Sequence, residues 1–274
     1  MAITAQEVNK LRQQTGAGMM DCKKALEENN GDFEQAIDYL RKKGAKVAAN
    51  RGDRDSKEGV VLAKTSADNK RGILIWVNCE TDFVAINADF IAFADSIATI
   101  ALDKNAKTKE EILTLPYNGD ITVGDKFMEQ VGKIGEKIEI GYFETISAEK
   151  VSAYIHPGNR VSVIVGFNKE VADEVGRNVA MQAAAMAPVA LDKEGVTQEM
   201  LDRELEIARE VIRAEGKPED MVEKIAQGKI AKFYKESTLL NQEYIKDNKM
   251  TVAQYLQSVD KGLTATAFKR YALS

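Results

Sequence analysis

Apolar residues along the chain follow the period of strands and then the period of a helix, and this order occurs twice. The first copy begins with EGVVLAKT and GILIWVN, within residues 58–78, and continues into a helical pattern at 88–102. The second copy begins with KVSAYIHPGNRVSVIVGF, at residues 150–167, and its helical pattern ends near residue 191. Apolar runs bounded by turn residues are typical of strands. Each copy therefore predicts two strands followed by a helix.

The two copies also align without a gap, residues 72–104 over residues 161–193, and both end in Ala-Leu-Asp-Lys. This alignment places Asp103 and Asp192 at equivalent helix ends. One further strand is predicted after each copy, at residues 137–146 and 265–273. The repeat predicts an α+β protein with two duplicated core lobes, each with helices on one face of a small antiparallel sheet.

Three short helical patterns occupy the start of the chain. The first follows a capping box of Thr4 and Glu7, and the second covers about Met19–Glu28. The third begins at Asp32, whose carboxylate can cap the first turn, and we expect Gly44 to end it. This pattern predicts a three-helix bundle like that of ubiquitin-associated domains, which bind other proteins.

Residues 197–235 carry two apolar stripes at helical spacing, joined by a turn at Gly216 and Pro218. They predict an antiparallel helical hairpin, a short coiled coil, inserted into the second lobe. The hairpin is either a contact surface, for a partner or for dimerisation of the chain, or a local extension of the core. The predicted domains are an N-terminal bundle with its linker at 1–50, lobe 1 at 51–148, lobe 2 at 149–196 and 236–274, and the hairpin at 197–235.

Composition and charge narrow the classes of function. The 274 residues carry a net charge of −5 and a sequence pI near 5.3. Sequence-independent nucleic-acid binding needs a basic face, so we expect no direct nucleic-acid partner. No apolar run approaches the ~20 residues that span a bilayer, and the N-terminus lacks the apolar centre of a signal peptide. We therefore expect a cytoplasmic protein without membrane contacts.

Residues that carry enzyme chemistry are sparse. The chain has two cysteines, Cys22 and Cys79, and one histidine, His156, which are too few for a structural zinc site. Gly16 and Gly18 lack the preceding strand of a phosphate-binding loop. We expect no metal, no cofactor and no covalent chemistry. An enzyme with an unfamiliar site remains an alternative class.

One connection between a strand and a helix has unusual residues. In VNCETDFVA (77–85), Asp82 and Phe83 stand where polar turn residues would serve. The equivalent connection of the second copy, residues 168–173, has no such pair, so the repeated architecture does not require it. Phe83 either folds back as a hydrophobic plug, with Thr81 or Asp82 capping the next helix, or stands exposed as an aromatic anchor for a partner.

Met19 and Met20 are adjacent at the start of the second predicted helix. Neighbouring positions on a helix do not share a face, so both cannot enter the core of the bundle. At least one is expected at the surface, where methionine offers an adaptable contact.

Three segments together resemble the bacterial elongation factor Ts family. They are LRQQTGAGMMDCKKALEENNGD (11–32), VNCETDFVA (77–85) and GKPEDMVEKIAQGKIAKFYKESTLLNQ (216–242), and their order and spacing also resemble that family. The chain departs from the family pattern at Trp76 and Ile86, where an acidic and a basic residue are common. The resemblance implies a guanine nucleotide exchange factor that releases GDP from the GTPase elongation factor Tu and stays bound until GTP enters.

The resemblance also implies which residues bind the partner. Asp82 and Phe83 would insert near the partner's magnesium and phosphates, and the bundle would hold its nucleotide domain. The second lobe, with His156, would meet another domain of the partner. The implied binding residues are Arg12, Met19, Met20, Lys23, Thr81, Asp82, Phe83, Val84, Ile134, Gly135 and His156. An adaptor or chaperone-like protein that uses only the bundle is the alternative, and it has no need of a Thr-Asp-Phe wedge.

Overall fold

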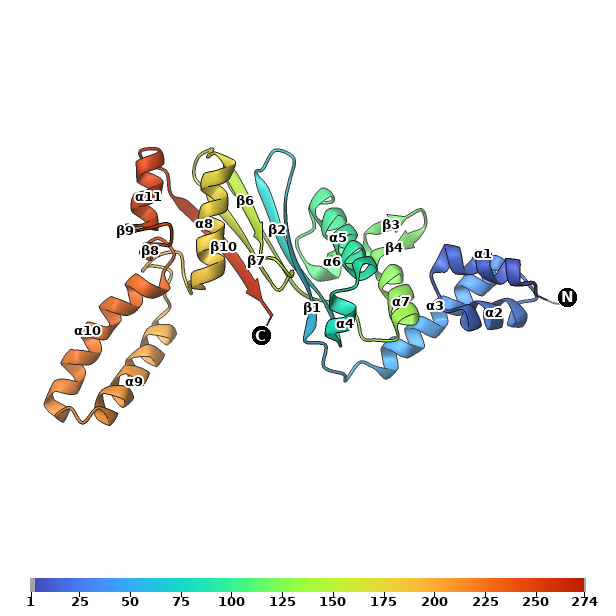
Figure 1. Ribbon diagram of the computed structural model, residues 1–274, viewed down its shortest axis with the longest axis horizontal. Coiled ribbons are helices and arrows are strands. Elements are labelled where there is room, and N and C mark those ends of the chain that lie inside the picture. The colour runs from blue at the N-terminus through green and yellow to red at the C-terminus, as the bar shows by residue number, and fades with distance from the viewer. Residues whose placement is uncertain (1–2, 274) are drawn as a thin grey trace.

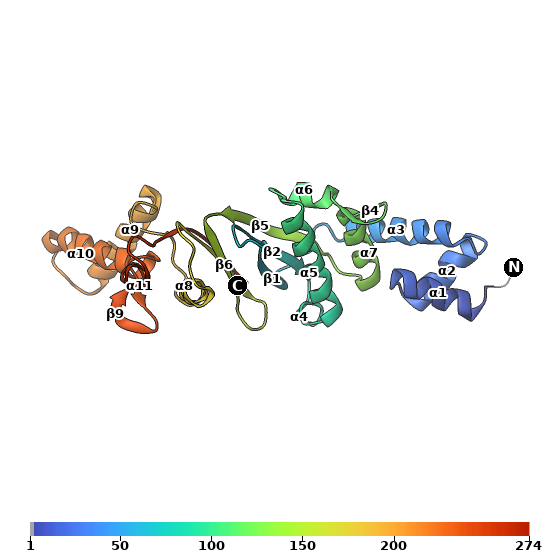
Figure 2. The same ribbon diagram turned by 90° about the horizontal axis from the view of Figure 1, so that it is seen from above.

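Figure 1 shows the protein as a computed structural model, which describes residues 3–273. The molecule is elongated, with a helical bundle at one end, a pair of long helices at the other, and two sheets between them (Figures 1 and 2). The fold is α+β and its sheets are antiparallel, as the sequence predicts. The predicted domain boundaries remain predictions.

The bundle consists of α1 (Ala5–Thr15), α2 (Met19–Glu28) and α3 (Phe33–Asn50). The predicted capping box is present, because the Thr4 hydroxyl accepts from the Glu7 amide while the Glu7 carboxylate accepts from the Thr4 amide. Asp32 caps α3 as expected. The small core consists of Val8, Leu11, Ala17, Cys22, Ala25, Leu26 and Ala36.

The prediction that Gly44 ends the third helix is wrong, because α3 continues to Asn50. Gly44 instead lies where α3 crosses α7 (Val123–Ile134), and a Cβ atom there would stand 2.2 Å from the Met128 carbonyl oxygen. Gly132 faces it from α7, where a Cβ atom would stand 3.1 Å from the Gly44 Cα. The glycine therefore permits a close crossing of two helices.

Lobe 1 contains a three-stranded sheet with the order β1–β2–β5, formed by β1 (Glu58–Thr65), β2 (Arg71–Cys79) and β5 (Glu139–Ser147). One face packs against α5 (Ala88–Asp103), α6 (Lys109–Thr114) and α7, with Ile73, Ile75 and Phe90 in the buried core. A small ribbon of β3 (Pro116–Asn118) and β4 (Ile121–Thr122) precedes α7.

Lobe 2 repeats this topology. Its sheet has the order β10–β7–β6, formed by β6 (Lys150–Ile155), β7 (Val161–Phe167) and β10 (Ala265–Ala272). In both lobes the third strand pairs with the second strand of the hairpin. The outer face is covered by α8 (Asp173–Met186) and α11 (Val252–Val259), and the ribbon of β8 (Glu243–Tyr244) and β9 (Asp247–Thr251) precedes α11.

The gapless alignment misplaces the helix of lobe 2. It predicts a helix to about residue 191, but α8 ends at Met186, so Asp192 does not lie at a helix end, whereas Asp103 does end α5. Ala187 has a φ of 44° and precedes Pro188, and a residue before proline disfavours the helical conformation. The shared Ala-Leu-Asp-Lys therefore occupies different structures in the two lobes.

The two sheets pack face to face, so the layers run helix, sheet, sheet, helix (Figure 1). Ala63, Leu74, Ile146, Val151 and Ile164 are buried between the sheets. Beside them the rings of Trp76 and Tyr271 stack with centroids 5.1 Å apart, and those of Tyr142 and Tyr271 with centroids 4.5 Å apart. Apolar burial on this shared face joins the lobes into one body.

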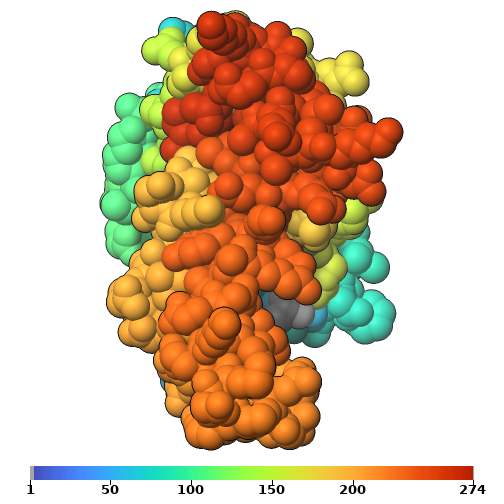
Figure 3. All heavy atoms as spheres, turned by 90° about the vertical axis from the view of Figure 1, so that its left-hand side faces the viewer, coloured from blue at the N-terminus to red at the C-terminus, as the bar shows by residue number. Residues whose placement is uncertain are grey.

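Residues 197–235 fall on α9 (Gln198–Ala214) and α10 (Glu219–Ser237), which contact each other through Ala208, Ile212, Val222 and Ala226. These side chains form a cluster separate from the core of lobe 2. Figure 3 views the molecule from this end, and α10, in orange, extends away from the red C-terminal segments. A role of these helices in dimerisation remains a prediction.

Candidate partner-binding site

The corner, which we define as residues 79–84, presents Phe83 to solvent. Thr81 caps the one-turn helix α4 (Asp82–Ala85), because its hydroxyl accepts from the Val84 amide. The Phe83 side chain is 79% exposed. Of the two sequence-based alternatives, the hydrophobic plug is therefore wrong, although its capping component is correct. Asp82 is also exposed, and its carboxylate accepts from the Phe83 amide at 2.9 Å.

Two carboxylates fix the backbone of the corner. The Glu136 carboxylate accepts hydrogen bonds from the amides of Glu80 and Thr81, at 3.0 and 3.1 Å, and from the Thr81 hydroxyl at 2.6 Å. The Glu80 carboxylate in turn accepts from the Lys137 amide at 2.7 Å and from Arg51 at 2.8 Å. Burial opposes ionisation of Glu80, but these hydrogen bonds outweigh it and hold the pKa of Glu80 below its usual value.

The base of the corner is apolar, and its cysteine is unreactive. Val84 packs against the core of lobe 1, and Cys79 is fully buried. Burial, reinforced by the charge of Glu136, raises the pKa of the Cys79 thiol to about 12. The thiolate is the nucleophilic form of cysteine, so this thiol is unreactive at neutral pH. The corner thus combines a fixed base with an exposed aromatic ring.

Ile134 and Gly135 lie directly beside this corner in the fold. Ile134 is the last residue of α7 and is partly buried against the core of lobe 1. Gly135 ends α7 with a φ of 80°, a left-handed conformation that favours glycine. This turn brings Glu136 to the corner, so the structure does bring Ile134, Gly135 and the Thr-Asp-Phe segment together.

The bundle residues singled out from the sequence are exposed. Met19 and Met20 are 55% and 73% exposed, so the expectation that at least one lies at the surface is confirmed. Arg12 is also exposed, and Lys23 pairs with Glu27 at 3.7 Å across one turn of α2. These four side chains are available to a partner.

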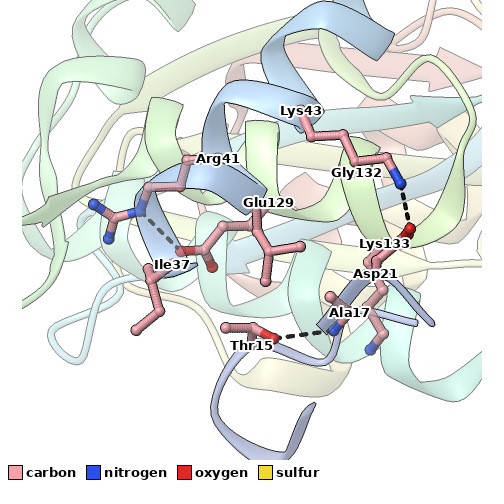
Figure 4. Close-up of a pocket in the computed structure, with 10 residues that line it drawn as sticks. Thr15, Ala17, Asp21, Ile37, Arg41, Lys43, Glu129, Gly132 and Lys133 are labelled. Atoms are coloured by element: carbon pink, nitrogen blue, oxygen red, sulfur yellow. Dashed lines mark hydrogen bonds and ion pairs between the residues drawn. The ribbon is translucent and has the colours of Figure 1, made fainter. Parts of the chain in front are cut away.

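The bundle meets lobe 1 through α3 and α7 (Figure 4). Arg41 of α3 faces Glu129 of α7 at 3.5 Å, and Lys43 pairs with Asp21 within the bundle. Lys133 of α7 continues the connection toward the corner, because it lies beside Gly16 and reaches Asp89 at the start of α5. Figure 2 shows α1 and α4 at the same edge of the molecule.

His156 lies in a separate turn, between β6 and β7 of lobe 2. It is exposed, and its Nδ1 atom is 3.0 Å from the Tyr154 hydroxyl. The turn is tied to β1, because the Asn159 carbonyl accepts from the Val61 amide and Arg160 pairs with Glu58. Glu58 lies opposite Cys79 in the sheet register. His156 therefore lies toward the end of the sheet that carries the corner, but on the other lobe.

Sequence reasoning missed Glu136, Glu80 and Lys133. Nothing in the sequence distinguishes Glu136 from the other acidic residues, except its place directly after a glycine that ends an apolar helix. The sequence predicts no helix in the segment that contains α6 and α7, so the side chains that this segment brings to the corner are not predicted either. These contacts join residues that are distant in the sequence: Glu136 and Thr81, for example, are separated by 55 positions.

Residues 3–273 contain neither a metal-binding cluster nor a membrane-spanning helix. No group of three or more His, Cys, Asp or Glu side chains in this part of the chain is placed to hold a metal ion. Over the same residues, every helix is too short or too polar to cross a bilayer.

The fold and the exposed corner together define a class, an elongated α+β protein with an exposed aromatic side chain on its core and two surface methionines on its bundle. Residues 80–274 match the family model described as Elongation factor TS. The chain is 58% identical over 273 residues to elongation factor Ts of Christiangramia forsetii, which covers 99% of this chain and 98% of that protein.

Two further relatives are similar over the whole chain. Elongation factor Ts of Flavobacterium psychrophilum is 54% identical over 273 residues, covering 99% of this chain and 98% of the relative. Elongation factor Ts of Porphyromonas gingivalis is 49% identical over 276 residues, covering 100% of this chain and 99% of the relative. The chain belongs to the elongation factor Ts family.

Proposed function

We propose that this protein is a guanine nucleotide exchange factor for elongation factor Tu. It binds the GDP-bound partner, promotes release of GDP and stays bound to the nucleotide-free partner until GTP enters. Membership of the elongation factor Ts family supports this function. The observation that carries it is the 79% exposure of Phe83 on a corner whose backbone is held by hydrogen bonds.

Exchange follows from binding alone. A factor that binds the nucleotide-free partner more tightly than the GDP-bound partner must weaken GDP binding by the same factor, because the two equilibria are linked. No step requires this chain to make or break a covalent bond. The protein acts as a binding factor in this proposal and not as an enzyme.

Phe83 is the wedge of the proposed mechanism. A packed protein core does not absorb an extra aromatic ring without shifting its helices. Insertion of Phe83 near the partner's nucleotide site would displace the residues that support magnesium. Magnesium neutralises the phosphate charges of the nucleotide, so its displacement weakens GDP binding. Asp82 adds a charge beside the ring, either as a competing acceptor or through repulsion of the phosphates.

The remaining binding residues divide between three surfaces. Arg12, Met19, Met20 and Lys23 form the bundle surface, which would hold the partner's nucleotide domain. Ile134 and Gly135 extend the surface of the corner. His156, on lobe 2, would meet another domain of the partner. Their exposure or proximity to the corner supports this division.

The alternative function is that of an adaptor, which would use the bundle surface without promoting exchange. The exposed Phe83 favours exchange, because an adaptor does not require a large aromatic side chain in solvent on the core lobe. The test is the release of labelled GDP from purified elongation factor Tu, with and without this protein. We expect a large acceleration. Binding to elongation factor Tu without any acceleration would favour the adaptor and overturn the exchange function.

A further inference from the structure

Glu136 holds the corner from outside it through three hydrogen bonds, two from amides and one from a hydroxyl. It lies in the turn after α7 and is only partly exposed. Hydrogen bonds to a carboxylate are about twice as strong as those between neutral groups. The corner therefore depends on a residue that is far away in sequence.

We propose that Glu136 is the positioning residue of the exchange surface, which fixes the corner so that Phe83 is presented to the partner. This role rests on the proposed exchange function. Glu136 acts through Thr81 and not on the partner, because its carboxylate is turned toward the backbone of the corner. It is therefore not itself a binding residue.

The Thr81 hydroxyl transmits this effect. It donates its only hydrogen to Glu136 at 2.6 Å, and its oxygen accepts from the Val84 amide at the start of α4. Donation to Glu136 thus orients the lone pair that caps α4. Phe83 lies within this one-turn helix, so its direction depends on the cap.

A helix of four residues has little stability of its own, because helix nucleation is costly. Without Glu136, the corner would populate other conformations. The maximal rate of GDP release would then fall in proportion to the fraction of molecules that present Phe83. Docking through the bundle surface would be unchanged, so the concentration of this protein that gives half of the maximal rate should rise by a smaller factor than the maximal rate falls.

Asp125 offers a matched control within the same lobe. It lies at the opposite end of α7, and its carboxylate accepts from the Thr122 amide at 3.0 Å and from the Thr122 hydroxyl at 2.7 Å. Asp125→Ala therefore removes similar bonds to a carboxylate at the other end of α7, away from the corner. A comparison of the two variants separates positioning of the corner from general stability of lobe 1.

The experiment measures GDP release from elongation factor Tu as a function of the concentration of the full chain, for wild type, Glu136→Ala, Glu136→Gln and Asp125→Ala. We expect Glu136→Ala to lower the maximal rate at least about fivefold and to raise the half-saturating concentration by a smaller factor. The maximal rate of Glu136→Gln should lie between those of wild type and Glu136→Ala, because the carbonyl oxygen of glutamine still accepts hydrogen bonds. Asp125→Ala should keep the wild-type maximal rate. Faster hydrogen exchange of the Glu80 and Thr81 amides should accompany only the Glu136 variants.

The outcomes separate the two proposals. If wild type fails to accelerate GDP release, the exchange function is overturned, and this role with it. If wild type accelerates release and Glu136→Ala retains the wild-type maximal rate, only the positioning role is overturned. An equal loss of maximal rate in Glu136→Ala and Asp125→Ala also overturns it, because that loss would reflect stability. If Glu136→Ala does not fold, Glu136→Gln decides the outcome by the same criteria.

Discussion

At the scale of single residues, the exposure of Phe83 separates its contribution to binding from its contribution to folding. A side chain that is 79% exposed buries little apolar surface in the free protein, so its removal changes the stability by less than about 0.5 kcal/mol. The same ring is the wedge of the proposed mechanism. Its two effects are therefore measurable independently.

We expect Phe83→Ala to slow stimulated GDP release by more than about tenfold, because the loss of an interface anchor commonly costs 2 kcal/mol or more. Its midpoint of urea unfolding should match that of wild type. Ile86→Ala, which removes another exposed apolar side chain three positions further on, is the comparison variant. Equal exchange rates for wild type and Phe83→Ala would contradict the wedge.

Asp125 provides a prediction about pH. Hydrogen bonds from the Thr122 hydroxyl and amide hold the pKa of Asp125 below its usual value. A carboxyl group whose pKa is lower in the folded state stabilises the fold above its unfolded pKa of about 3.9, and this contribution is lost as the pH falls through the folded pKa. Asp125→Asn should therefore lower the free energy of unfolding by about 1 kcal/mol at pH 7 and by much less near pH 3. Urea unfolding at several pH values measures this, and a difference that is constant with pH would contradict it.

At the scale of elements, two glycines inside helices differ in their surroundings: one is required by close packing and the other is not. Gly44 of α3 lies against the backbone of α7, whereas Gly228 of α10 has no atom within 4 Å of the place of a Cβ. Glycine inside a helix costs stability unless a close approach requires it. The surroundings of each glycine decide the effect of adding a methyl group.

Gly44→Ala should destabilise the protein by about 1–3 kcal/mol, because the new Cβ would stand 2.2 Å from a backbone oxygen and the helices must separate. Gly228→Ala should instead stabilise α10 by about 0.5–1 kcal/mol. Urea unfolding of the two variants measures both values. Destabilisation of similar size in both would show that the crossing of α3 and α7 is not the cause.

The same glycines show how far sequence patterns predict elements. The strands of the two hairpins, β1, β2, β6 and β7, and the helix α5 were predictable, because their apolar periodicity is strong and their ends carry turn residues, whereas the short strands β3, β4, β8 and β9 were not predicted. Gly44 was mistaken for a helix end, because a sequence does not distinguish a glycine that stops a helix from one that lets another helix approach. At the corner, the aromatic residue was identifiable, but Glu136 was not, because its role depends on a contact between distant segments.

At the scale of the whole molecule, the two sheets share an apolar face, and we therefore expect the lobes to unfold as one unit. Leu74 and Ile75 are neighbours on β2 and both are fully buried, but Leu74 lies between the sheets and Ile75 lies in the core of lobe 1. Opposite faces of a strand thus serve two different cores. Substitutions at these two positions distinguish coupling between the lobes from stability within one lobe.

We expect the slowest-exchanging amides of β2 and β7 to report the same free energy of opening in wild type, because the lobes unfold together. Ile75→Ala should lower both values equally, by about 2–5 kcal/mol. Leu74→Ala should make the two values differ, because it weakens the face that joins the sheets. Native-state hydrogen exchange measures these energies, and equal lowering by Leu74→Ala would contradict the coupling.

The continuity of α3 has a consequence for the geometry of binding. One helix of 18 residues, α3, runs from the bundle onto lobe 1. The number of residues in this helix therefore sets the rotation of the bundle about the helix axis. One alanine inserted after Leu40 would rotate the bundle by about 100° and advance it by about 1.5 Å, which would change the direction in which Met19 and Met20 face relative to Phe83. An insertion of seven residues would nearly restore the direction at a greater separation. The number of residues in α3 thus sets the angle of the bundle. The affinity for elongation factor Tu should therefore rise and fall with the number of inserted residues, with the period of the helix.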